Sequence, residues 1–317
     1  MNLCQTLWAS YDALKQAHSD AEMFLEEGKN LSLADYKNAL EKLSKAKEDY
    51  NKSFYTTLPD GREIYALDFL SLINLCDNNN IKVEPILKLQ GDNFLNNNRR
   101  INALNLNSLS LKTVEVSTLK ELTILNCSIN NLSCLDVSHN KALIDLNCLE
   151  NNLSALDVSH NHALAELYCC KNKLESLDVS QNPALTHLSC YENQIEFLDI
   201  SNNPKLTELY CLVNKLSSLN ITNNHLLIKL DCSYNELDSL NITNNTLITE
   251  LSCSSNKISA LDLSNNSCLE ELDCSNNLLT SLLYHENLVK LNITVCIEGN
   301  RFNKAFIKLA KKRGWIS

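Results

Sequence analysis

The sequence predicts an α/β repeat protein: a right-handed solenoid of short parallel strands with helices at each end. Three observations lead to this fold class. The tetrapeptide LDVS or a close variant begins at residues 135, 156, 177, 198, 219, 240 and 261, always 21 residues on. Glycine (5) and proline (4) are scarce among 317 residues, while asparagine returns at fixed places in each period. Apolar residues at helical spacing flank the repeat on both sides.

Residues 1–100 are predicted to form a helical N-terminal cap, because an open solenoid must cover its first turn. Apolar residues recur at helical spacing over 7–25 and again over 36–54, which predicts a helical hairpin. The stretch EIYALDFLSLINLC (63–76) predicts a third helix. The stretch VEPILKLQGDN (83–93) predicts a strand that leads into the first turn.

Residues 101–297 are predicted to form the solenoid, with about nine turns of the pattern LxxLxCxxNxLxxLDVSxNxx. In the first half of one turn, Leu146 and Cys148 alternate with Asn147 and Leu149, so the first pair faces the core and the second pair faces out. The two halves of the pattern look alike, which predicts two short strands in each turn.

Two asparagine columns are predicted to close the bends of each turn, because an amide both donates to and accepts from buried backbone groups. The first column is Asn151, Asn172, Asn193, Asn214, Asn235, Asn256 and Asn277, and the second is Asn140, Asn161, Asn182, Asn203, Asn224, Asn245 and Asn266.

Residues 298–317 are predicted to form a C-terminal capping helix. Phe302, Phe306 and Leu309 lie on one face, and basic residues stand in its last turn before Gly314. We interpret the basic run as compensating the negative end of the helix dipole. The alternative is a contact with a membrane or an acidic protein.

This pattern resembles the leucine-rich repeat family, in the 21-residue variant called the IRREKO type, with cysteine where leucine usually stands. The resemblance implies a rigid, curved binding surface and no enzymatic activity. With its helical N-terminal region, the chain also resembles leucine-rich repeat effectors that intracellular bacteria deliver into host cells.

Eight cysteines occupy one inward column of the repeat, and we interpret them as a stack of small buried hydrophobes with inert thiols. They are Cys127, Cys148, Cys169, Cys190, Cys211, Cys232, Cys253 and Cys274. The alternative is a redox or metal ladder, but zinc needs four ligands that converge on one point, which a straight row does not supply. Cys170 is predicted to face the surface instead.

The outward strand positions form the candidate binding face, which is aromatic and apolar in its middle and acidic toward the C-terminus. The candidate partner-binding residues are Leu149, Glu166, Tyr168, Cys170, His187, Tyr191, Glu208, Tyr210, Leu212, Asp231 and Tyr234, with Val213 beside them. The alternative interpretation is that the outward tyrosines and leucines only fill space between turns.

The charge balance favours a protein partner with a basic or mixed surface. Residues 101–299 contain 23 Asp and Glu against 10 Lys and Arg, a balance of −13, so nucleic acid would be repelled. We expect a monomer.

No catalytic, metal or cofactor site is predicted. Cys170 and His187 are the candidate pair for covalent catalysis, but a single cysteine–histidine pair on an open face is weak support for it. His139, His160 and His162 share one bend, and five aspartates (Asp136, Asp157, Asp178, Asp199, Asp262) stripe the second half-turn. We interpret the histidines as solvent-exposed turn residues; the alternative is a metal held by two or three imidazoles. Calcium binding is the alternative for the aspartates, but the glycine-rich pattern of calcium-binding repeats is missing, so we interpret them as a solvated face.

The first residues lack a basic, apolar leader, and no apolar run approaches the roughly 18 residues of a membrane span. Cysteine usage indicates a reducing compartment. By resemblance, the expected location is the bacterial cytoplasm and then the host cytosol, after secretion without a signal peptide. The alternative function is a ubiquitin-ligase adaptor, because residues 58–76 distantly resemble the opening of an F-box.

Overall fold

The computed structural model describes residues 55–58, 62–90, 94–284 and 294–313. The chain separates into two compact units, one of Met1–Asp77 with Ile81–Ile101 and one of Asn78–Asn80 with Asn102–Ser317. The helical hairpin expected before residue 55 lies outside the described residues. No helix among the described residues is long and apolar enough to cross a membrane.

The described part of the N-terminal unit starts with a two-stranded antiparallel sheet. Strand β1 (Tyr55–Thr57) pairs with β2 (Glu63–Tyr65), and helix α3 (Ala66–Asn79) follows directly. The helix expected to start at Glu63 therefore starts three residues later. Ile64 and Tyr65 favour extended backbone, and pairing with β1 satisfies the backbone groups of these residues in place of a first helical turn.

The strand expected over 83–93 is wrong: Val83–Lys88 forms the short helix α4. Pro85 is its third residue, and a proline in the first turn of a helix removes no intrahelical hydrogen bond. Ile86 and Leu87 are buried. The segment thus buries its apolar residues in a helical conformation. A short apolar run in the sequence does not distinguish a buried helix from a buried strand.

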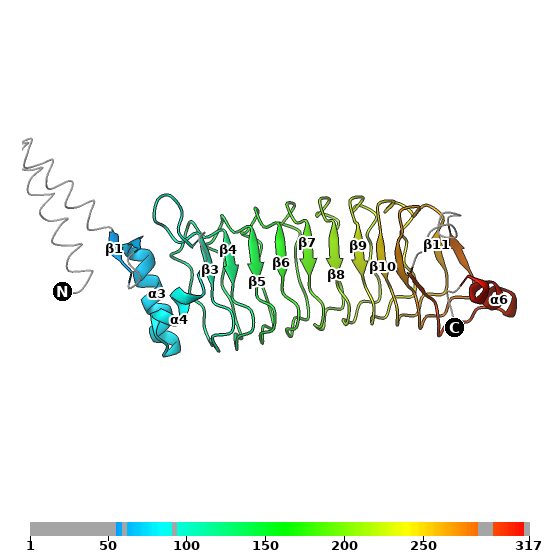
Figure 1. The fold of residues 1–317 in the computed structure, drawn as a ribbon, viewed down its shortest axis with the longest axis horizontal. Coiled ribbons are helices and arrows are strands. Elements are labelled where there is room, and N and C mark those ends of the chain that lie inside the picture. The colour runs from blue at the N-terminus through cyan, green and yellow to red at the C-terminus, as the bar shows by residue number, and fades with distance from the viewer. Residues whose placement is uncertain (1–54, 59–61, 91–93, 285–293, 314–317) are drawn as a thin grey trace, which may run out of the picture. The chain divides into compact units, whose positions relative to one another are not determined.

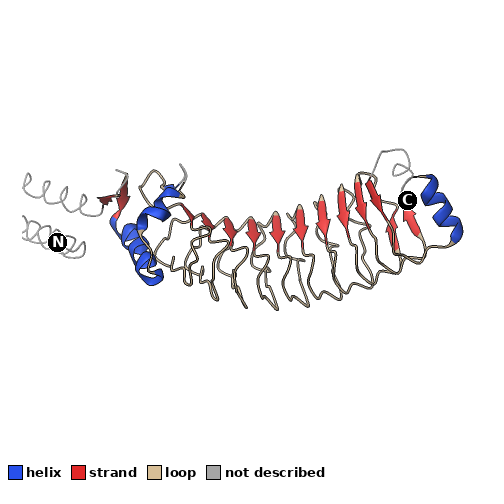
Figure 2. Ribbon diagram, turned by 60° about the horizontal axis from the view of Figure 1, so that its bottom comes forward, coloured by secondary structure: helices blue, strands red, loops and turns tan. Residues whose placement is uncertain are grey.

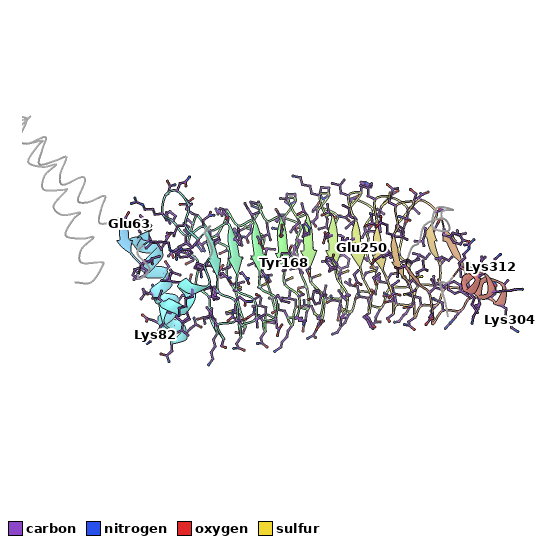
Figure 3. The ribbon with its side chains drawn as sticks, viewed as in Figure 1. Glu63, Lys82, Tyr168, Glu250, Lys304 and Lys312 are labelled. Atoms are coloured by element: carbon purple, nitrogen blue, oxygen red, sulfur yellow. The ribbon has the colours of Figure 1, made fainter. Side chains whose placement is uncertain are left out.

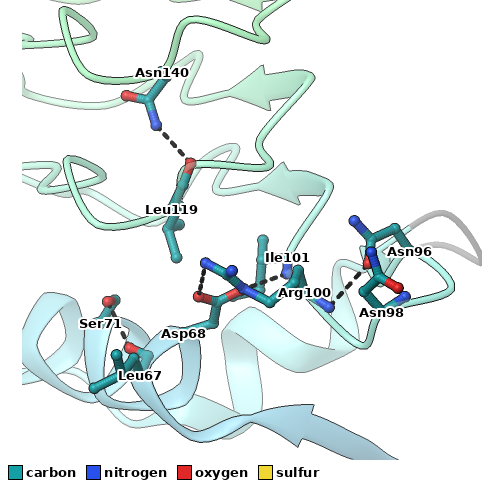
Figure 4. Close-up of polar contacts among 9 residues, drawn as sticks. All are labelled: Leu67, Asp68, Ser71, Asn96, Asn98, Arg100, Ile101, Leu119 and Asn140. Carbon is teal, nitrogen blue, oxygen red and sulfur yellow. Dashed lines mark hydrogen bonds and ion pairs between the residues drawn. The ribbon is translucent and has the colours of Figure 1, made fainter.

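A buried carboxylate holds the N-terminal unit together (Figure 4). Asp68, on α3, accepts hydrogen bonds from Nε and Nη2 of Arg100 at 3.0 Å each and from the backbone N–H of Ile101 at 2.8 Å. Its side chain is only 1% exposed. The paired guanidinium and the backbone donor compensate for the charge that burial would otherwise disfavour.

The second unit is a parallel solenoid built on one long sheet (Figure 1). Its ten strands are β3 (Ala103–Asn105), β4 (Ile124–Asn126), β5 (Asp145–Asn147), β6 (Glu166–Tyr168), β7 (His187–Ser189), β8 (Glu208–Tyr210), β9 (Lys229–Asp231), β10 (Glu250–Ser252), β12 (Glu271–Asp273) and β14 (Thr294–Cys296). Between β3 and β12 the partners are 21 residues apart, so Leu104 pairs with Leu125 and Leu125 with Leu146. The predicted repeat is confirmed.

In the ten-stranded sheet, the central residue of each strand from β4 to β12 is a leucine that faces the core, and the cysteine two residues later is buried beside it. Leu146 and Cys148 are both 0% exposed, as are their equivalents Leu167 and Cys169. The backbone continues the ladder past the strand, since Cys148 N–H donates to the carbonyl of Tyr168 at 2.8 Å. A small side chain fits at this position, where the chain turns away from the sheet.

The second half of the turn is less regular than predicted. Only β11 (Leu261–Leu263) and β13 (Leu282–Tyr284) pair there as strands among the described residues. Earlier turns make isolated bridges, from Glu115 to Asp136 and from Asp136 to Asp157.

Both asparagine columns close the bends, but only the amides of the first column both donate and accept as predicted. In the second column the amide nitrogens donate, while the buried Oδ1 atoms accept no hydrogen bond from the described residues. In the first column, Asn151 donates to the carbonyls of Cys127 and Cys148 at 3.0 and 3.1 Å and accepts from Leu132 N–H at 3.0 Å. In the second column, Asn140 donates to the carbonyls of Val116 and Leu119, both at 2.9 Å; Figure 4 draws the bond to Leu119. Each amide therefore ties its own turn to the preceding one.

Helix α6 (Lys304–Lys312) ends the described chain. Its N-cap Asn303 accepts a hydrogen bond from Phe306 N–H at 2.9 Å, and the rings of Phe302 and Phe306 stack at 4.3 Å. Lys304 and Lys312 mark its two ends in Figure 3.

Candidate protein-binding face

The ten-stranded sheet lines the inner side of the curved solenoid, and the loops of each turn lie on the outer side (Figure 2). The first and third residues of a strand point out of the core on this concave face, as the alternating burial of β5, β6 and β8 shows. Tyr168 and Glu250 are labelled on two strands of the sheet in Figure 3. Adjacent turns therefore place their outward residues in continuous columns.

Two tyrosines on this face are held by glutamates of their own strands. The hydroxyl of Tyr168 donates to Glu166 Oε2 at 2.8 Å, and that of Tyr210 donates to Glu208 Oε2 at 3.0 Å. Burial, and then the hydrogen bond to Glu208, raises the pKa of Tyr210 to about 12. Burial and Glu166 raise the pKa of Tyr168 in the same way. Both rings are thus fixed along their strands as neutral phenols.

Ser189 lies between these two tyrosines, because β7 pairs with β6 on one side and β8 on the other. The next column carries charge. His187 Nε2 lies 3.5 Å from Glu208 Oε1, and Lys229 Nζ lies 2.7 Å from Glu250 Oε1. Near the start of the column, burial and the charge of Glu166 raise the pKa of Asp145.

The structure places most of the predicted site residues together on the concave face. Register pairing joins Glu166, His187 and Glu208 in one column, and Tyr168, Tyr210 and Asp231 lie in the next. Leu149, Tyr191 and Leu212 follow the strands and are half-buried. Tyr234 is 60% exposed and stands beyond the end of β9.

The prediction that Cys170 is a surface residue is wrong, since its side chain is 3% exposed. The Ser189 hydroxyl lies 3.5 Å from its sulfur, and Tyr191, the equivalent residue one turn on, is close enough to lower the pKa of the thiol in part. Burial raises the pKa of its thiol. His187 instead contacts the Thr186 hydroxyl at 3.0 Å and Glu208, so these contacts form no cysteine–histidine pair.

Two features of the face were not predicted. The residue three positions after most strands has a positive φ although it is not glycine; examples are Val213 and Tyr234, both at 53°. A cavity of about 240 Å³ lies over the C-terminal strands and is lined by Asp231, Glu250, Ser252, Glu271 and Asp273 together with residues of the flanking columns. The sequence signal for this cavity was the small, acidic character of these turns.

Among the described residues, no group of three or more histidine, cysteine or acidic side chains is placed to hold a metal ion. Each cysteine of the inward column is buried, and burial raises the pKa of these thiols, to about 12 for Cys127 and Cys190. The five stripe aspartates accept hydrogen bonds from the backbone N–H two residues on, for example Asp178 from Ser180 at 2.9 Å. They therefore shape turns.

No family profile and no curated protein matches this chain. Among solved structures, the functional domain of InlJ from Listeria monocytogenes, described as including a cysteine ladder, is 38% identical over 64% of this chain, with a TM-score of 0.62. A leucine-rich repeat protein of Leptospira interrogans is 24% identical over 68% of the chain, with a TM-score of 0.55.

The leucine-rich effector protein YopM from Yersinia pestis is 23% identical over 73% of this chain and 69% of its own, with a TM-score of 0.56. The chain spans only 45% of the Listeria structure and 54% of the Leptospira structure. The shared features are the parallel solenoid and, in the Listeria protein, the cysteine ladder. The described residues thus form a leucine-rich repeat solenoid of the 21-residue type.

Proposed function

We propose that this chain is a non-enzymatic protein-binding module whose concave face holds a partner protein. The observation that carries the proposal is the pair of tyrosines, Tyr168 and Tyr210, each hydrogen-bonded to a glutamate. Rigid aromatic side chains lose little conformational entropy on binding and are common anchors of protein interfaces. The solenoid core does not require them, since Asn126 and Asn147 stand in the same column.

The proposed contact residues are the sequence-predicted set on β5 to β9 and the turns that follow these strands. Cys170 belongs to this set only as a support, because it lies under Ser189 and Tyr191. The acidic balance of the solenoid favours a partner whose surface is basic or mixed.

A role as a bacterial effector is the finer part of the proposal. Its support is the similarity to the InlJ domain and the shared fold of the Yersinia effector protein. In such a role, binding would block or regulate a host protein, another effector or an enzyme's active site, and the chain would work in the host cytosol. The F-box-like adaptor function of residues 58–76 stays a prediction that no comparison supports.

The test is affinity purification with the full chain and with the Tyr168→Ala, Tyr210→Ala double variant. We expect the double variant to lose its partner while its melting temperature stays within a few degrees of the native value, because both rings are only part-buried. Phe197→Ala is the matched control, since this ring is 67% exposed and does not lie on the sheet. A folded double variant that captures the partner undiminished would refute the proposed face.

A further inference from the structure

The two halves of the concave face differ in charge. At the first and third residues of β8, β9, β10, β12 and β14, the outward positions carry five carboxylates and one ammonium group. The carboxylates belong to Glu208, Asp231, Glu250, Glu271 and Asp273, and the ammonium group to Lys229. Over β3 to β7 the same positions carry only two carboxylates, those of Asp145 and Glu166, and no lysine or arginine. The negative potential therefore concentrates over the C-terminal strands.

The cavity of about 240 Å³ lies within this acidic half. Ser252 pairs with Asp231 on one side and with Asp273 on the other, so two carboxylates flank a small residue. With strands about 4.8 Å apart, the two aspartates stand about 10 Å apart. A cationic side chain seated over Ser252 would lie within reach of both carboxylates, whereas a bulkier residue at this position would fill the space.

The structure of the turn does not need the charge of these aspartates. Asp231 and Asp273 each accept a hydrogen bond, at 3.0 Å, from the backbone N–H of the serine two residues later. Asn126 and Asn147 do the same in their own turns, at 3.1 Å. A neutral amide therefore performs the structural role, and the negative charge at residues 231 and 273 is additional to it.

Over these C-terminal strands, one described lysine, Lys229, faces outward, and it does not balance the negative charge of the carboxylates. Lys229 is engaged with Glu250 at 2.7 Å, and among the described residues no ion pair is formed by Glu271 or Asp273. Carboxylates crowded on one face repel each other, and a cationic ligand relieves that repulsion.

Large apolar side chains stand at both ends of the same strands. Val213 and Tyr234 follow β8 and β9 and are 41% and 60% exposed, while Leu226, Ile228 and Leu247 precede β9 and β10 and are also exposed. Val213 and Tyr234 adopt a positive φ, which is unfavourable for a β-branched or bulky residue. Folding alone would favour asparagine or glycine there.

We infer that the acidic groove over β8, β9, β10, β12 and β14 binds a segment of a partner protein. This segment inserts lysine or arginine side chains between Asp231 and Asp273 and rests apolar side chains on Val213 and Tyr234. The inference rests on the proposed function and names the partner's chemistry at that face. The acidic groove supplies the charge complementarity, and the apolar rims favour a polypeptide over a polyamine or another small cation.

The probes are three short fluorescent peptides in which leucine alternates with lysine, glutamate or serine, titrated against the full chain by fluorescence anisotropy. We expect only the lysine peptide to bind, and to bind more weakly as salt is raised. Asp231→Asn with Asp273→Asn should weaken this binding at least about tenfold. Asp157→Asn with Asp178→Asn is the matched control and should change binding less than about twofold, because the same charge is removed outside the groove.

That control preserves the fold, because Asn220 and Asn241 already stand in the stripe column and accept the same turn hydrogen bond. Equal weakening by both aspartate pairs would reduce the effect to net charge and overturn the inference, as would absence of lysine-peptide binding. A second variant, Val213→Asn with Tyr234→Asn, should weaken the peptide about threefold or more without lowering the melting temperature. If this variant binds the lysine peptide with unchanged affinity, the inferred contact with Val213 and Tyr234 is wrong.

The inference and the proposed function fail in different ways. If a natural partner is lost on Tyr168→Ala with Tyr210→Ala but binds Asp231→Asn with Asp273→Asn undiminished, the cation groove is wrong and the binding face stands. If neither pair affects the partner, both are wrong.

Discussion

Each cysteine of the inward column is buried, and burial keeps its side chain in the protonated thiol form, which is less reactive than the thiolate. Cys148 and Cys169 are 0% exposed, and burial raises the pKa of Cys190 to about 12, from 9.0. The thiolate is the nucleophile, so at neutral pH its population falls about a thousandfold for such a shift. The column therefore contributes packing, and its regular spacing does not indicate redox chemistry.

We expect iodoacetamide at about pH 8 to modify Cys134 and Cys268, which are exposed, and to leave the inward column and Cys170 intact. In urea all of these thiols should react, because unfolding removes the burial that raises their pKa. Peptide mass spectrometry of the two samples measures both outcomes. Modification of Cys190 in native buffer at the rate of Cys134 would contradict the assignment.

Cys170 shows where residue-level prediction from the sequence ends. Period-two alternation places Tyr168 and Cys170 on the same face, but the strand stops at Tyr168 and Lys171 already has a φ of 53°. Beyond a three-residue strand, exposure depends on the neighbouring turn, where Ser189 and Tyr191 interact with the thiol. A repeat pattern predicts what each column shares, whereas the burial of one side chain by particular neighbours is a property of a single turn.

At the scale of elements, the stripe aspartates are turn-forming residues. Asp136, Asp157 and Asp199 each accept the backbone N–H two residues on at 2.9 Å. Hydrogen bonds from Ser138 lower the pKa of Asp136, and those from Ser201 lower that of Asp199. A carboxyl whose folded pKa is depressed adds stability above its unfolded pKa and loses it as pH falls through the folded value.

The native chain should therefore lose stability as the pH falls below about 4. A variant with asparagine at all five stripe positions (136, 157, 178, 199 and 262) should lose less over the same range. Its turns keep their hydrogen bonds, because Asn220 and Asn241 make them already. Urea midpoints at neutral pH and below pH 4 measure this difference. Parallel acid dependence in the two proteins would exclude a role of these carboxylates.

Element boundaries were predictable inside the repeat and less so before it. Seven copies of LDVS or a close variant specify the register of each turn, so the positions of Leu146 and Asn151 followed directly. Residues 63–65 and 83–88 occur once, and nothing repeated decides between helix and strand there. Pairing with β1 makes residues 63–65 a strand, and burial of Ile86 and Leu87 favours the helix at residues 83–88. Both are tertiary effects.

The candidate face was predicted in position and only partly in chemistry. The columns that hold Tyr168, Tyr210 and Asp231 followed from the period. The cavity did not, because it depends on a small residue, Ser252, standing between Asp231 and Asp273. The positive φ of Val213 was also missed, because valine is a poor indicator of a left-handed residue.

At the scale of the solenoid unit, stability is a sum over similar turns that contact only their neighbours. Leu146 pairs with Leu125 and Leu167, and Asn151 bonds within its own turn and to the turn before. No described hydrogen bond in the middle of the solenoid joins turns further apart than neighbours. One whole turn is therefore removable if the columns still meet at the new junction.

Deletion of Leu174–Gln194 tests this property, because it removes 21 residues and places Ile195 in the buried column of Leu174. Strands β6 and β8 would then pair, and we expect a folded protein whose free energy of unfolding is about 2 kcal/mol lower. Its denaturant dependence should fall by roughly a tenth, in proportion to the surface removed.

The matched control deletes one residue more, Leu174–Ile195. The junction turn then has 20 residues and draws Glu196, an exposed residue, toward the column of Leu174. Loss of a buried aliphatic side chain and strain at the junction should cost about 3 kcal/mol beyond the first deletion. Urea unfolding followed by circular dichroism compares the two. Equal stability would mean that the turns are not held by column-to-column contacts, and the one-dimensional description of the solenoid would have to be abandoned.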